Sequence, residues 1–140
     1  MDGLSGAASV IAVIQIAQSV ASGLKDYYEG VRDARADIRT LYNSIKGLEA
    51  ILSAIQDLLN RGDAGLAESK QSLEPPLRQS ELDLTKLRFD LQGSQEKLQK
   101  FGRAAQSLAW PFKKKDVEKT VDALERDKSA LMLGLGVENL

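Results

Sequence analysis

The N-terminal segment carries the feature that most constrains the fold, a long stretch without any charged side chain. Every position from Gly3 to Leu24 is uncharged. As a helix rising about 1.5 Å per residue, this stretch is about 33 Å long, enough to cross the hydrocarbon core of a bilayer. It also contains polar residues that make it a poor constitutive membrane span, namely Ser9, Gln15, Gln18, Ser19 and Ser22. The segment therefore suits either the core of a helical domain or conditional contact with a membrane.

The order of apolar residues in this segment predicts an amphipathic helix over residues 4–24. At about 100° per residue, one stripe contains Val10, Val13, Ile14, Ala17, Val20, Ala21 and Leu24. Ile11 falls among the polar residues, and Ile16 lies at the edge of the stripe. One interpretation is an ordinary core helix. The other is a helix that docks in a bundle at rest and later enters a bilayer, with these candidate membrane-active residues: Leu4, Val10, Ile11, Val13, Ile14, Ile16 and Val20.

The opening Met1-Asp2, without a basic leader, disfavours a secretory signal peptide and excludes the N-myristoylation pattern. A chain of 140 residues fits one domain. It has no cysteine and no histidine, which removes disulfides, thiolate metal sites and the commonest general base. The formal charge of −1 gives no bulk attraction to nucleic acid. Phosphate-binding and hydrolase motifs are also missing, so we expect no enzyme activity, no cofactor, no metal and no nucleic-acid partner.

The remaining apolar spacing predicts an all-α protein, an elongated antiparallel four-helix bundle. A second helix is expected over residues 26–60, with a seam of Val31, Ala34, Ile38, Leu41, Ile45, Leu48, Leu52, Ile55 and Leu59. A short separate helical turn over 66–73 is expected to be broken by Pro75-Pro76. A third helix follows over 76–108, and a fourth begins near Lys114 or Asp116. The bundle is assigned to residues 1–133, and residues 134–140 to a C-terminal end or the start of a linker.

Residues 97–115 contain six basic side chains and no acidic one, with Phe101, Trp110 and Phe112 among them. Cations and interfacial tryptophan are what an anionic bilayer surface attracts. The candidate contacts to anionic lipid are Lys97, Lys100, Arg103, Trp110, Lys113, Lys114 and Lys115. The alternative interpretation is a solvated loop whose Trp110 and Phe112 close one end of the core.

Three blocks of the sequence resemble a known family in the same order. The first is the opening MDGLSGAASVIAVI, the second is DARADIRTL followed by a leucine-rich seam, and the third is WPFKKKDVEK with LERDKSAL. Together they resemble the HeLo-like N-terminal domain of fungal STAND proteins, the NOD-like receptors of fungi. The resemblance covers nearly the whole chain.

The resemblance implies a role in programmed cell death, heterokaryon incompatibility and innate immunity. Such domains precede a NACHT or NB-ARC domain, or a short amyloid-forming motif. In related domains the N-terminal helix permeabilises membranes, so the implied executor segment here is residues 4–24. The implied protein is cytoplasmic at rest and membrane-associated after activation, with self-association and membrane lipids as partners.

Two mechanisms compete at this stage. In the first, oligomerisation releases the N-terminal helix from the bundle and the helix permeabilises a membrane. In the second, the bundle is an adaptor that associates with itself or with a partner bundle and never touches lipid, since heptad seams support helix association equally well. A plain structural bundle is the third possibility.

Overall fold

The computed structural model describes residues 5–30, 35–61, 66–101 and 110–136, with side chains described for 10–28, 35–61, 71–93 and 110–136. Within these ranges the chain forms four helices: α1 (Ser5–Gly30), α2 (Arg35–Arg61), α3 (Leu66–Phe101) and α5 (Lys114–Gly134). The predicted all-α four-helix bundle is therefore confirmed. Some predictions fall outside these ranges, namely those on Leu4, Val31, Ala34 and Arg103 and the end of the third helix at residue 108.

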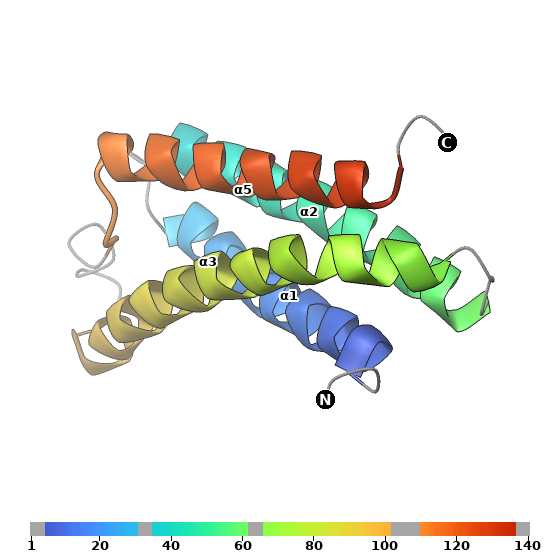
Figure 1. Cartoon of the computed structure of the whole chain (residues 1–140). Helices are drawn as coiled ribbons and strands as arrows, with labels where there is room; N and C mark the ends of the chain where they lie inside the picture. The colour runs from blue at the N-terminus through green and yellow to red at the C-terminus, as the bar shows by residue number, and fades with distance from the viewer. Residues whose placement is uncertain (1–4, 31–34, 62–65, 102–109, 137–140) are drawn as a thin grey trace.

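Helices that follow one another in the chain run in opposite directions, and the bundle is elongated along them (Figure 1). The helices α1 and α5 each pack against both α2 and α3. The two middle helices of the sequence thus carry two different interfaces, one toward the N-terminal helix and one toward the C-terminal helix.

The predicted apolar stripe of α1 packs into the hydrophobic core. All seven stripe residues are buried, as is Ile16, whereas Ile11 is 39% exposed. The prediction that the first helix ends near Leu24 is wrong, because α1 continues to Gly30. Tyr27 lies three positions after Leu24 and is fully buried. Since the stripe extends through Tyr27, continuing the helix buries one more large ring.

The predicted start of the second helix at residue 26 is also wrong, because α2 begins at Arg35. From there its seam is as predicted. Leu59 is partly buried, and the buried seam residues are Ile38, Leu41, Ile45, Leu48, Leu52 and Ile55.

The expected break at Pro75-Pro76 does not occur. Both prolines lie inside α3, which begins at Leu66, so the separate short helix is the first part of one long helix. An internal proline costs a helix about 3 kcal/mol because it removes an amide donor and crowds the preceding turn. Leu73 and Leu77, on either side of the prolines, are 1% and 8% exposed. Burying each of these leucines contributes about 1.5–3 kcal/mol, which offsets much of the cost of the two prolines, so packing overrides the local preference.

The fourth helix begins and ends close to where the sequence placed it. The amide of Lys113, the N-cap residue, donates to the Asp116 Oδ2 at 3.1 Å, as in a capping box. The helix buries Val117, Leu124 and Leu131. After Gly134 the chain turns through Gly136, whose φ of 73° is a conformation that favours glycine.

Candidate functional site

The N-terminal helix meets the rest of the bundle through apolar side chains. Of the candidate membrane-active residues, those packed in the core are Val10, Val13, Ile14, Ile16 and Val20. Ile11 lies on the exposed side, and Leu4 lies outside the described residues. The exposed side of α1 over residues 10–24 carries only uncharged polar side chains besides Ile11, namely Gln15, Gln18, Ser19 and Ser22. Over residues 10–28, where its side chains are described, the helix is therefore docked through its apolar stripe.

Three aromatic rings join the C-terminal half of α1 to the segment that leads into α5. Trp110 packs edge-on against Tyr27 with ring centroids 5.2 Å apart, and Phe112 packs edge-on against Trp110, also at 5.2 Å. Tyr27 is fully buried, while Trp110 and Phe112 are half-buried against the core. The structure thus places Trp110 at one end of the core, as the second sequence interpretation expected.

Of the basic residues predicted to contact anionic lipid, the structure describes only some as a group. Lys113, Lys114 and Lys115 are exposed and consecutive at the start of α5. Lys97 and Lys100 lie in the last turns of α3, where side chains are not described, and Arg103 lies outside the described residues. Cations in the first turn of a helix oppose its dipole, so helix stability gives no reason for three lysines there.

A second contact ties the end of α1 to the start of α2. The Arg39 Nη2 donates to the Tyr28 hydroxyl at 2.7 Å, and the Arg35 Nε donates to the Tyr28 carbonyl at 3.2 Å. Both guanidinium groups also lie over the Tyr28 ring, at 5.3 Å for Arg35 and 5.7 Å for Arg39. The hydrogen bond and charge of Arg39 lower the pKa of Tyr28. This exposed cluster was not anticipated from the sequence.

The interface between α5 and α2 is polar at its centre. The Glu125 Oε2 accepts hydrogen bonds from the Ser44 Oγ and from the Lys128 Nζ, each at 2.7 Å. The hydrogen bond from Lys128 lowers the pKa of Glu125, and the one from Ser44 acts in the same direction. Gly47 of α2 leaves room for the Lys128 ammonium, since a Cβ there would lie 2.9 Å from the Nζ.

The interface between α5 and α3 contains a buried acid. Asp127 is 4% exposed, and its Oδ2 has no hydrogen-bond partner among the described residues. Burial, followed by the hydrogen bond and charge of Asp83, raises the pKa of Asp127 to about 8. Two acids thus meet between α3 and α5, and the protonated form of Asp127 is favoured.

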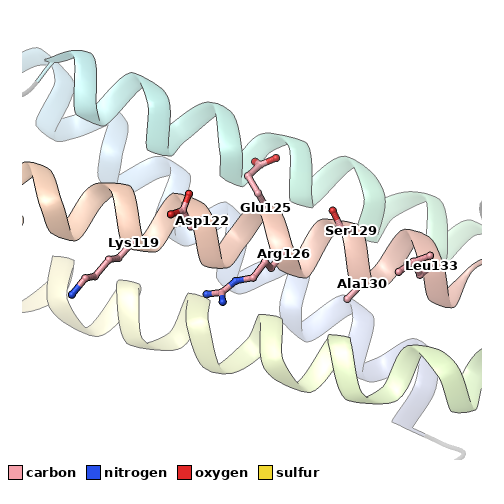
Figure 2. A pocket seen from close by; sticks show the side chains of 7 residues that line it. All are labelled: Lys119, Asp122, Glu125, Arg126, Ser129, Ala130 and Leu133. Carbon is pink, nitrogen blue, oxygen red and sulfur yellow. The ribbon is translucent and has the colours of Figure 1, made fainter.

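The outer surface of α5 forms an open depression rather than an enclosed cavity. Figure 2 shows Glu125 directed toward α2, whereas Lys119 and Arg126 extend on the side of α3. The depression is lined by Lys119, Asp122, Glu125, Arg126, Ser129, Ala130 and Leu133. All seven lie on one helix, so this surface offers no converging set of groups for a small ligand.

A pair of apolar side chains on α3 is exposed, which the sequence pattern did not predict. Leu82 is 58% exposed and Phe89 is 75% exposed. They are seven residues apart and therefore lie on one face of the helix. The signal was present in the sequence, because both residues fall off the seam that contains Leu84, Leu87 and Leu91.

Comparison of the chain with protein-family models, curated proteins and solved structures finds no match. In the described part of the chain, no cluster of acidic side chains has the makings of a metal site. None of the helices in the described ranges is both long enough and apolar enough to cross a membrane.

Proposed function

We propose that this chain is a membrane-permeabilising execution domain of the HeLo-like type, with α1 as the membrane-active element. The observation that carries the proposal is the docking of α1, a helix without charges through Leu24, by way of an apolar stripe. Such a helix gives up mainly apolar contacts when it leaves the bundle. A bilayer interface can replace those contacts, and the serines and glutamines of the other face can remain in the headgroup region.

The proposed setting is the N-terminal end of a fungal NOD-like receptor, ahead of a NACHT or NB-ARC domain or an amyloid motif. The domain would be cytoplasmic at rest and would act without catalysis or a cofactor. Receptor oligomerisation would raise the local concentration of bundles. Burial of each large α1 side chain is worth about 1.5–3 kcal/mol, so release requires that lipid and neighbouring copies together replace most of that free energy.

Dye leakage from anionic vesicles tests the role of α1. We expect the wild-type chain, clustered through an added tag, to release dye from phosphatidylcholine–phosphatidylserine vesicles. Ile11→Glu and Gln15→Glu add a charge to the exposed side of docked α1, where they leave the core intact. Because a charge is costly in the bilayer, each substitution is expected to reduce the leakage rate about ten-fold or more.

Gln92→Glu is the matched control for these variants. It adds the same charge at an exposed position of α3, so it reproduces any general repulsion from anionic lipid. Circular dichroism should show the same helix content for all three variants. Unchanged leakage by both α1 variants would mean that α1 is not the active element.

Flotation with vesicles tests the lysines at the start of α5. Replacing Lys113, Lys114 and Lys115 by Gln is expected to weaken binding to anionic vesicles about a hundred-fold, at about 1 kcal/mol per cation. The control replaces three exposed lysines of other helices by Gln, namely Lys25, Lys46 and Lys86. Equal losses for both triple variants would indicate a net-charge effect without a defined contact.

An adaptor bundle is the second candidate, and the exposed Leu82 and Phe89 of α3 favour it. Exposed apolar side chains on one helix face can bind a second helix as well as a lipid surface. Under this alternative, Leu82→Ser with Phe89→Ser abolishes self-association in sedimentation experiments, and no oligomeric form of the wild type floats with vesicles. Flotation that survives this double substitution supports the membrane function.

A further inference from the structure

The segment proposed to contact lipid also packs on the C-terminal half of α1, through the contact of Trp110 with Tyr27. Trp110 touches the buried ring of Tyr27, with centroids 5.2 Å apart and planes at 67°. Only two residues separate Trp110 from Lys113, the first of the three exposed lysines. At about 3.3 Å per residue, Lys113 lies within about 10 Å of Trp110 along the chain. A surface that binds these lysines therefore acts close to the aromatic contact.

The indole N–H of Trp110 lacks a hydrogen-bond acceptor in the bundle, among the residues that the structure describes. Its Nε1 is buried and has no hydrogen-bond partner among the described residues. A buried donor without an acceptor is unfavourable compared with the same donor in water or among lipid headgroups. Tryptophan also prefers the membrane–water interface, where the ring is covered and the N–H is hydrated. Trp110 is therefore a residue for which a bilayer interface competes with the bundle.

Trp110 cannot contact Tyr27 and lie in a bilayer interface at the same time. Tyr27 is fully buried, so a bilayer cannot reach the contact between the rings while the bundle is intact. An indole at headgroup depth must leave Tyr27, and we expect Phe112, which packs edge-on against the indole, to move with it. Departure of Trp110 uncovers Tyr27, the residue through which this segment packs on α1.

We propose that the contact between Trp110 and Tyr27 is a lipid-sensitive clamp, which holds α1 in the bundle until Trp110 enters an anionic bilayer interface. This inference rests on the proposed function, because it names the lipid surface as the trigger that loosens α1. The partner is an anionic membrane, since three consecutive exposed cations follow the aromatic pair. The nearest acid, Asp116, already accepts the Lys113 amide.

The chain suits a direct measurement, because Trp110 is its only tryptophan and it has no cysteine. In solution, Tyr27→Ala is expected to shift the Trp110 emission to longer wavelength, whereas Tyr27→Phe keeps the ring contact and the emission. Trp110→Leu is expected to raise amide exchange in residues 24–28 about three- to ten-fold, and Trp110→Phe is expected to restore protection. Unchanged exchange in Trp110→Leu overturns the clamp without any reference to lipid.

On vesicles, the experiment follows Trp110 and α1 in the same titration. Brominated phosphatidylcholine in phosphatidylserine-containing vesicles is expected to quench Trp110 over the same lipid range in which α1 amides lose protection. Vesicles of phosphatidylcholine alone are expected to do neither. Quenched Trp110 with unchanged α1 exchange overturns the clamp but leaves membrane binding in place. Absence of any binding to the anionic vesicles overturns both the lipid trigger and the proposed function.

Discussion

At the scale of single residues, two of the three buried polar side chains that the structure describes lie at the interfaces of α5. Ser44, Ser80 and Asp127 are the buried polar side chains among the described residues. The Ser80 hydroxyl donates to the Pro76 carbonyl of its own helix at 2.8 Å, and Ser44 donates to Glu125. Asp127 is different, because its buried carboxyl faces the acid Asp83. The interface of α5 therefore depends on protonation.

The raised pKa of Asp127 predicts that the protein loses stability as the pH rises. Its pKa is about 8 in the folded protein and 3.8 by ordinary reference. Between these values the folded chain holds a proton that the unfolded chain has released, so the free energy of unfolding falls with increasing pH. Asp127→Asn removes this titration and is expected to raise the free energy of unfolding by about 1–3 kcal/mol near pH 8.5, by less near pH 5, and by little near pH 3, below both pKa values.

Urea unfolding at several pH values measures this effect. The control is Asp122→Asn, which changes an exposed acid of the same helix and is expected to leave the slope with pH as in the wild type. A slope that persists in Asp127→Asn would show that another group is responsible.

At the scale of helices, close approach between α5 and α3 is set by a glycine. A Cβ at Gly134 would lie 3.0 Å from the Leu73 Cδ2 and 3.1 Å from the Ser72 carbonyl oxygen. The Ser72 carbonyl oxygen belongs to the backbone and cannot move aside, whereas the Lys128 ammonium near Gly47 ends a flexible side chain. Gly93 of α3 is the opposite case, because a Cβ there would meet nothing within 4 Å.

The two glycines give a matched pair of alanine substitutions. Gly93→Ala is expected to raise the free energy of unfolding by about 0.5–1 kcal/mol through helix propensity alone. Gly134→Ala is expected to lower it by about 1–3 kcal/mol, because the added methyl group forces α5 away from α3. Thermal and urea unfolding of both variants test the pair, and a stabilised Gly134→Ala would contradict the close packing.

At the scale of the whole molecule, the two outer helices are held very differently. The described part of α1 buries nine apolar side chains: Val10, Val13, Ile14, Ile16, Ala17, Val20, Ala21, Leu24 and Tyr27. In α5 the buried residues are Val117, Leu124, Asp127 and Leu131. Because apolar burial dominates the attachment of a helix, α5 should separate from α2 and α3 more easily than α1 does.

Native-state hydrogen exchange tests this order. Amides of α5 are expected to exchange through a partial opening, about 2 kcal/mol or more below the free energy of global unfolding. Amides in the middle of α1 are expected to exchange only with global unfolding in the absence of lipid. Equal protection of both helices would contradict this order, and earlier exchange of α1 would indicate that it is the weakly held element in solution.

The extensive burial of α1 limits how this helix could reach a membrane. Because the apolar stripe from Val10 to Tyr27 is buried, α1 can present that stripe to lipid only after a change of conformation, which requires an external source of free energy. Clustering of several copies and binding of the Lys113–Lys115 segment to anionic lipid are the two sources named above. The clamp at Trp110 would couple the second source to α1.

The amino-acid sequence by itself determined the helical class and the inward face of each helix. The stripe from Val10 to Leu24 and the seam from Ile38 to Ile55 are buried as their spacing predicts, because a period near 3.6 leaves one face to exclude water. The exposed position of Ile11 and the start of the fourth helix also followed from local pattern. These features depend on residues a few positions apart.

Only the tertiary structure decided where long helices continue and which side chains meet. The passage of α3 through Pro75-Pro76 and the extension of α1 to Tyr27 depend on burial against other helices, which outweighs local preference. The contact of Trp110 with Tyr27 and that of Asp83 with Asp127 join residues more than forty positions apart. No local periodicity encodes such contacts, because they arise from the packing of whole helices.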